Sequence, residues 1–315
     1  ILWGVPRNCC MTKSGSEPQN TSLSGSFVPW LYAMGSKIRQ VNLREMALDA
    51  SVMASGAIDS AKLFNLPVAC VNFDTTLWAE AVGCSVDRDG AFPMVESGGS
   101  TDTNPDLVRE ADQVIILKDA ISRVKGALAS HQVVCAIPGP ATLAVDLAIP
   151  SPATKKDQFI VGELLTEFVN VLCENGIDNI LVLEGPELSD DDLEPWIEGN
   201  HYSRIVKLTK HYAVETTLLC PQATLTEEQI QAFDDFTYVA ANPESTVMAD
   251  FENAVKAVYV DGFGTGSVAI PEGVSELQFG TYIFTTGWDL DVSHDFTDIQ
   301  NDIAEIQDFL EEASG

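Results

Sequence analysis

The segment LLTEFVNVLCENGIDNILVLEGP, residues 164–186, decides the fold class. Its first half belongs to an apolar pattern with helical spacing, which predicts an amphipathic helix over 157–175. Gly176 follows where a helix C-cap belongs, and a short turn leads into the apolar run Ile180–Leu183. A buried strand directly after a helix is the repeating unit of a parallel α/β sheet, so the segment predicts that class.

The same alternation recurs along the chain. Strands are expected at Phe27–Tyr32, Val68–Phe73, Val133–Ile137, Ile180–Leu183, Thr216–Cys220, Tyr238–Ala241, Ala257–Val260 and Thr281–Thr285. Helices are expected at about 43–64, 105–129, 157–175, 189–210, 226–234, 247–256 and 296–312. Eight such strands predict a (β/α)8 TIM barrel formed by one domain over 1–315, with 1–26 a polar, mobile N-terminal segment. An open doubly wound sheet is the alternative, but Gly262–Gly266 lies late and lacks the third glycine of a dinucleotide fingerprint.

Composition limits the partners. The 47 acidic and 17 basic residues give a net charge of −30, and such a surface repels nucleic acid and anionic membranes. No apolar stretch reaches the roughly 18 residues of a transmembrane helix, and the N-terminus lacks a basic region ahead of a long apolar core. The seven cysteines show no disulfide spacing, so we expect a cytoplasmic protein. Whether the acidity reflects a high-salt cytoplasm stays open.

In a parallel barrel, catalytic side chains lie where strands end. Asp74 and Glu184 each follow an apolar strand and are the candidate catalytic carboxylates. Asp74 serves equally well as a helix N-cap, and Glu184 as a structural cap or ion pair. Cys220 ends another strand and is a candidate metal ligand, although a strand-end cysteine is more often part of the core.

Four further residues are candidate substrate contacts. Gly139 and Pro140 form a turn that allows close approach of a ligand, and the same turn also suits simple helix entry. Trp288 offers a flat aromatic wall, and His294 lies in a loop that enters the last helix.

Several segments together resemble the uroporphyrinogen decarboxylase superfamily. FDTTLWAEAVGCSVD (73–87) resembles its strand-then-helix signature, and AIPGPATLAVDL (136–147) resembles its Gly-Pro turn. LLTEFVNVLCENGIDNILVLEGPELS (164–189) and FTTGWDLDVSHDFTDIQNDI (284–303) are similar to its acidic strand end and closing strand. The resemblance covers about residues 40–310 and implies a barrel of this superfamily.

The resemblance implies two chemistries. The decarboxylases hold a polycarboxylate substrate with an N-terminal arginine motif, which is absent from PWLYAMGSKIRQ (29–40). The thiol-directed methyltransferases bind zinc through His-x-Cys and a last-strand Cys. Cys220 matches one ligand, but Leu218 and Trp288 occupy the other two positions, so a complete zinc site is not expected. The chain also lacks Asp-x-His-x-x-Gly for binding a corrinoid itself.

We therefore expect a methyltransferase that moves a methyl group between a small methylated donor or acceptor and a corrinoid (cobalamin-type) cofactor carried by a separate protein. Asp74 and Glu184 would position the substrate and manage its proton. The alternatives are a catalytically degenerate barrel that binds a tetrapyrrole or a partner, and a decarboxylase with unusual substrate contacts. A homodimer is left open.

Overall fold

The computed structural model describes most of the chain beyond residue 25. The described ranges are 26–89, 92–98, 105–185, 188, 190–220, 225–241, 256–260, 262–266, 268–269, 282–286, 289–290 and 292–314. The predicted N-terminal segment, apart from Ser26, lies outside these residues, and so does most of the helix predicted at 247–256.

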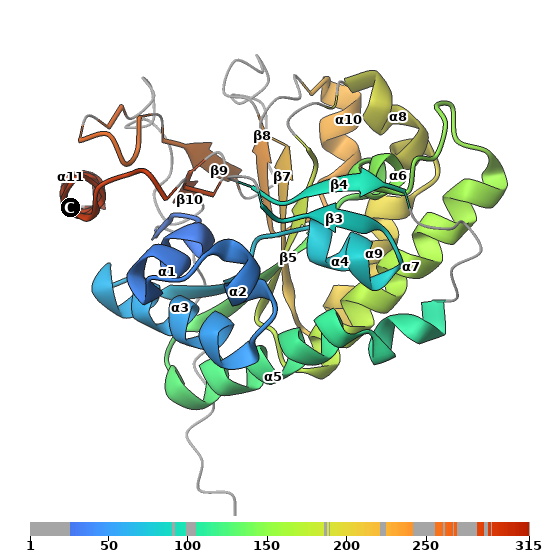
Figure 1. Cartoon of the computed structure of the whole chain (residues 1–315). Coiled ribbons are helices and arrows are strands. Elements are labelled where there is room, and N and C mark those ends of the chain that lie inside the picture. The colour runs from blue at the N-terminus through green and yellow to red at the C-terminus, as the bar shows by residue number, and fades with distance from the viewer. Residues whose placement is uncertain are drawn as a thin grey trace, which may run out of the picture.

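Eight parallel strands form the central sheet, in agreement with the predicted barrel (Figure 1). They are β1 (Phe27–Val28), β2 (Val68–Asn72), β5 (Gln132–Pro138), β6 (Asn179–Leu183), β7 (Glu215–Cys220), β8 (Tyr238–Ala241), β9 (Lys256–Tyr259) and β10 (Tyr282–Thr285). Neighbours in space follow the chain order, and β1 pairs with β10 through Phe27 opposite Phe284. First and last strands that pair in this way bring the sheet around into a barrel.

The barrel has a seam between β1 and β2. Within the described residues no hydrogen-bonded ladder joins these two strands, which are the ends of the sheet order. Instead the rings of Trp30 and Phe73, which follow the two strands, have centroids 6.1 Å apart. Side chains rather than backbone therefore bridge the barrel at this point.

Helices surround the strands. They are α1 (Tyr32–Arg39), α2 (Leu43–Ala47), α3 (Ala50–Leu63), α4 (Thr76–Ala81), a 3-10 turn (Pro105–Glu110), α5 (Asp112–Ala127), α6 (Pro140–Asp146), α7 (Lys155–Glu174), α8 (Asp190–Glu198), α9 (His201–His211), α10 (Glu227–Ala232) and α11 (Phe296–Ser314). In the part of the chain that the structure describes, none of the helices is both long and apolar enough for a membrane crossing.

Some predicted boundaries were wrong. The strand expected to reach Tyr32 ends at Val28, and α1 begins at Tyr32. The helix expected at 43–64 is two helices, because Asp49 caps α3 by accepting from the backbone amides of Ser51 and Val52. The helix expected at 189–210 breaks at Asn200, which has a left-handed φ of 58°.

A hairpin that the sequence did not reveal lies beside the barrel. Its strands, β3 (Ser85–Asp87) and β4 (Met94–Ser97), pair antiparallel and pass in front of the barrel strands in Figure 1. The hairpin follows α4, so it belongs to the connection between β2 and β5. It is therefore placed to shape the carboxyl-end face, where barrel chemistry is located.

The late glycine segment has a structural use. Gly262, Gly264 and Gly266 all have positive φ values, and the amides of Gly264 and Gly266 donate to the buried carboxylate of Asp302 in α11. Successive amides turned in this way form a small anion-binding nest. Here the anion is the protein's own side chain, which ties the last helix to the barrel.

Candidate active site at the carboxyl ends of the strands

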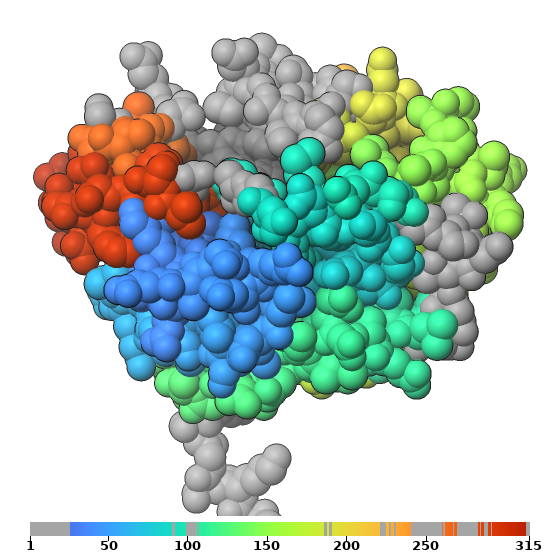
Figure 2. Space-filling view, in the orientation of Figure 1, coloured from blue at the N-terminus to red at the C-terminus, as the bar shows by residue number. Residues whose placement is uncertain are grey.

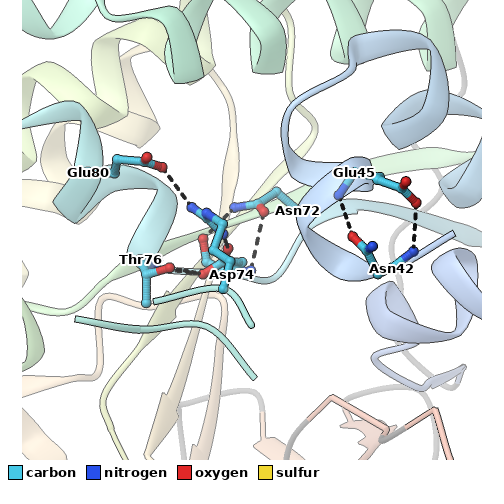
Figure 3. Close-up of polar contacts among 7 residues, drawn as sticks. Asn42, Glu45, Asn72, Asp74, Thr76 and Glu80 are labelled. Carbon is cyan, nitrogen blue, oxygen red and sulfur yellow. Dashed lines mark hydrogen bonds and ion pairs between the residues drawn. The ribbon is translucent and has the colours of Figure 1, made fainter. Parts of the chain in front are cut away.

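Asp74 follows β2, and its carboxylate is engaged on both oxygens (Figure 3). Its Oδ1 accepts from the backbone amide and the hydroxyl of Thr76 at 2.9 and 2.5 Å. Its Oδ2 accepts from the guanidinium of Arg88, and both side chains are only 5% exposed. The N-cap of α4 is Thr75, so the prediction that Asp74 occupies that position was wrong. Asp74 instead accepts from the first residue of the helix, Thr76, and forms a buried ion pair with Arg88.

Arg88 comes from the hairpin and links it to the barrel. A second nitrogen, Nη2, donates to Glu80 of α4 at 2.9 Å. The Nε atom is buried and has no hydrogen-bond partner among the described residues. A buried arginine held by two carboxylates fixes the hairpin over the end of β2, because separating such a pair leaves an uncompensated charge.

Glu184 follows β6 and is almost completely buried. Its oxygens accept from the amides of Ala141 and Thr142 at 3.3 and 2.9 Å and from the Thr142 hydroxyl at 2.6 Å. The hydroxyl of Tyr202 also donates to it. Burial raises the pKa of Glu184, and these hydrogen bonds oppose the rise. We call these donors the Glu184 cage; they hold the carboxylate at the first turn of α6.

Gly139 and Pro140 build the entry to this cage. Gly139 is the N-cap of α6 and Pro140 is its first residue, as the helix-entry interpretation expects. A Cβ atom on Gly139 would lie 2.2 Å from Cδ of Glu184, so glycine is what permits the close approach. Their predicted contact with substrate stays a prediction.

Asp289 and Tyr32 form a second polar group at the seam. Asp289 Oδ2 accepts from the amide of Ala33 at 2.8 Å, whereas its Oδ1 is buried and accepts no well-formed hydrogen bond from the described residues. The buried hydroxyl of Tyr32 likewise has no partner there. Burial, with a further contribution from the charge of Asp74, raises the pKa of Asp289 to about 8. This carboxyl therefore carries a proton at neutral pH.

A hollow of ≈ 620 Å³, a size typical of small-molecule sites, opens between the hairpin and α6. Thr75, Thr76 and Gly185 bring the ends of β2 and β6 to it. Its remaining lining is largely apolar and comes from β4, α6 and the residues around them, including Pro93, Met94, Val95 and Val145. Met94 is 68% exposed, so an apolar side chain stands at the rim. Figure 2 shows the hairpin, in teal, on the visible surface.

Cys220 does not present a zinc site with the described residues. Its Sγ lies 3.4 Å from the carbonyl oxygen of Ala240, and the side chain is 3% exposed. Leu218, two residues earlier, is buried in the same strand. The described ranges contain no group of three His, Cys, Asp or Glu side chains able to hold a metal ion. The residues therefore do not fit zinc, and a metal role for Cys220 stays a prediction.

The remaining candidates lie elsewhere. Trp288 is outside the described residues. The ring of His294 has its Nδ1 2.9 Å from the carbonyl oxygen of Gly264, so this histidine packs on the glycine loop. It is not among the residues that line the hollow. A contact between His294 and substrate stays a prediction.

Three residues of this face escaped sequence reasoning: Arg88, Tyr32 and Asp289. Arg88 lies in a segment with no strong strand pattern, and Tyr32 was assigned to a strand. Asp289 follows β10 at a position where strand-end reasoning applies. The position was visible, but the burial that holds its proton depends on the packed structure.

Comparisons with known proteins show similarity in fold. The chain matches no protein-family model and no curated protein sequence. Among solved structures it is similar to a methyltransferase from Methanosarcina mazei, with a TM-score of 0.65 and 15% identity over 91% of this chain and 93% of that one. A B12-independent methionine synthase from Shewanella gives a TM-score of 0.54 and 12% identity over 83% and 88% of the chains. At these identities the comparisons confirm the predicted barrel. They do not identify the activity, which has to be argued from the residues of the site.

Proposed function

We propose that the chain is a methyltransferase that moves a methyl group between a small methylated substrate or acceptor and a corrinoid carried by a separate protein. The observation that carries the proposal is the buried Asp289 carboxyl, which holds a proton at the carboxyl-end face and whose Oδ1 accepts no well-formed hydrogen bond from the described residues. The similar methyltransferase folds support the same reaction class.

The proton-handling role falls to Asp289 and Tyr32. When a methyl–oxygen or methyl–nitrogen bond breaks, the electron pair stays on the heteroatom, which then needs a proton. Asp289 has that proton, and the hydroxyl of Tyr32, unpartnered among the described residues, is available to align the heteroatom. In the reverse direction the ionised Asp289 accepts the proton. Asp74 and Glu184 remain predicted site residues, and their engaged oxygens suit a positioning role.

The hollow offers room for the corrinoid. Asp289 and Tyr32 do not line it, but Asp74 connects the two places: its charge acts on Asp289, and its partner Thr76 lines the hollow. A corrinoid supplies the cobalt centre that donates or receives the methyl group. Its flat ring matches the apolar wall formed by Pro93, Met94 and Val145. Exposed Met94 and Val145 at the rim also offer apolar surface to the protein that carries it. Thr75 and Thr76 bring hydroxyl groups to the lining for the smaller substrate, and the Thr76 hydroxyl also donates to Asp74.

The corrin absorbance spectrum tests the proposal. Purified chain is mixed with cob(I)alamin and a panel of methylated alcohols, amines and thioethers, or with methylcobalamin and the demethylated acceptors. We expect a spectral change that depends on the chain. Asp289→Asn should lower its rate by about a hundredfold, a typical loss for an acid–base residue. Asp308→Asn, at an exposed position on α11, is the matched control and should retain the rate.

A binding barrel without turnover is the second candidate, and one observation favours it. Both strand-end carboxylates, Asp74 and Glu184, are occupied by protein donors, as expected of a site that has lost its chemistry. Tetrapyrrole binding with no spectral change across the panel would support this candidate. Release of carbon dioxide from uroporphyrinogen would instead support a decarboxylase.

A further inference from the structure

A second cavity has Arg88 in its lining. It is a groove of ≈ 570 Å³ between α1, α2 and the hairpin, and its lining includes Lys37, Asn42, Arg44, Arg88 and Asp89. Figure 3 shows the Asn42–Glu45 cap of α2, of which Asn42 lines the groove. In Figure 2 the N-terminal helices, in blue, adjoin the teal hairpin on this face. Every residue that lines the groove is within the described ranges.

The charge of this groove is opposite to that of the whole chain. The chain has 47 acidic and 17 basic residues, yet the groove is lined by three basic side chains and one acidic one. A strongly negative protein keeps anions away in general, so a local cluster of cations is what an anionic ligand would require.

Two of these cations have little of their charge matched. Lys37 donates to the carbonyl oxygen of His294 and lies 4.9 Å from the ring centroid of Phe296. The pKa of Asp295 is lowered by hydrogen bonds from Thr297 and, to a smaller extent, by the charge of Lys37. One carboxylate therefore interacts electrostatically with this ammonium group. Neither the carbonyl contact nor the ring contact of Lys37 is an ion pair.

Arg44 has only a surface partner among the described residues. It contacts Asp89 at 3.3 Å, with the two side chains 58% and 83% exposed. Exposed pairs of this kind contribute little and exchange readily. Arg44 can therefore turn its planar guanidinium to a ligand, and a guanidinium binds oxyanions through two parallel hydrogen bonds.

Arg88 supplies an independent observation at the base of the groove. Its side chain is almost fully buried, with 5% exposed, and its Nε has no partner among the described residues. Asp74 and Glu80 already match its charge, so Nε adds a hydrogen-bond donor rather than an uncompensated cation. A buried donor without an acceptor is costly, and a ligand oxygen would satisfy it.

We propose that this groove binds a small molecule through an oxyanion, either a carboxylate or a phosphate, held by Lys37, Arg44 and the Nε of Arg88. Asn42 and Gln40 line the same groove and offer amides to the rest of the ligand. The groove is large enough for a metabolite of ordinary size. The proposal is separate from methyl transfer, since it concerns only binding at this groove.

Isothermal titration calorimetry of the full chain tests whether the groove binds an oxyanion. Two probes are used at constant ionic strength, pyrophosphate for the phosphate class and citrate for the carboxylate class. We expect saturable one-to-one binding of at least one probe. Arg44→Gln should weaken it about tenfold or more, the loss expected for a charge-assisted hydrogen bond. Asp89→Asn should strengthen binding, because it removes the carboxylate that competes for Arg44.

Controls separate a site from general charge effects. Arg39→Gln changes an exposed arginine of α1 that pairs with Asp59 and does not line the groove, so binding should be unchanged. Lys37→Arg should retain binding, and Lys37→Gln should lose it. Thermal melts establish that each variant is folded. The proposal is overturned if neither probe binds below about 10 mM, if Arg44→Gln binds as wild type, or if Arg39→Gln weakens binding equally.

Discussion

Adding one carbon atom at Gly139 should break the Glu184 cage. Gly139 has φ −70° and ψ 168°, which alanine adopts without strain, so the substitution acts through contacts alone. The new Cβ would lie 2.2 Å from both Cδ and Oε1 of Glu184 and 2.7 Å from Oε2. The carboxylate must move away from the donors on Ala141, Thr142 and Tyr202.

The expected cost follows from those contacts. Losing two hydrogen bonds to a buried carboxylate, each worth roughly 1.5–3 kcal/mol, predicts that Gly139→Ala lowers the free energy of unfolding by about 3–6 kcal/mol. Urea denaturation, followed by tryptophan fluorescence and circular dichroism, measures it. Gly126→Ala is the control: a methyl group added there would meet no neighbouring atom within 4 Å, and it should stabilise α5 by about 0.5–1 kcal/mol.

A double substitution isolates the cause. In a Glu184→Ala background the carboxylate is gone, so Gly139→Ala should then cost little. A clash with Glu184 is ruled out as the cause if Gly139→Ala is within about 1 kcal/mol of wild type, or if it costs as much with Glu184 absent as with Glu184 present.

Three further predictions concern charge. Asp289 has a folded-state pKa of about 8, against an ordinary value of 3.8. Between these pH values the folded protein keeps a proton that the unfolded chain releases. This carboxyl therefore makes the free energy of unfolding fall as pH rises through that range. Asp289→Asn should therefore gain stability relative to wild type from about pH 5 to about pH 7.5 in urea titrations, and a constant difference would contradict the assignment. Arg88→Met should lower the free energy of unfolding by about 3 kcal/mol, since it leaves Asp74 buried without its cation, and Asp74→Asn in the same chain should recover part of that loss. The net charge of −30 predicts a melting temperature that rises as KCl screens surface repulsion, whereas a flat salt response would indicate that the acids are already balanced locally.

The sequence predicted the barrel because buried strands and amphipathic helices have distinct periods. It also placed Asp74 and Glu184 correctly at strand ends. It could not predict that both carboxylates would be occupied, because their donors come from other elements: Arg88 from the hairpin and Tyr202 from α9. Contacts of this kind depend on tertiary packing, which has no short-range signal.

Element boundaries failed for local reasons. The apolar run after Phe27 continues through Tyr32, so a strand and a buried helix start look alike. The hairpin β3–β4 has mostly exposed side chains and therefore lacks a clear alternating pattern. The proton on Asp289 could not be predicted from the sequence either, because the pKa of a carboxyl depends on its burial and its neighbours in the folded structure.

Methyl transfer by this chain is measured from the corrin spectrum, with wild type and Asp289→Asn compared on the same panel of methyl donors and acceptors. We expect a spectral change that requires the chain, whose rate Asp289→Asn reduces about a hundredfold and Asp308→Asn leaves unchanged. No change across the panel with the wild-type chain, or an equal rate in Asp289→Asn, would contradict the proposed methyl transfer.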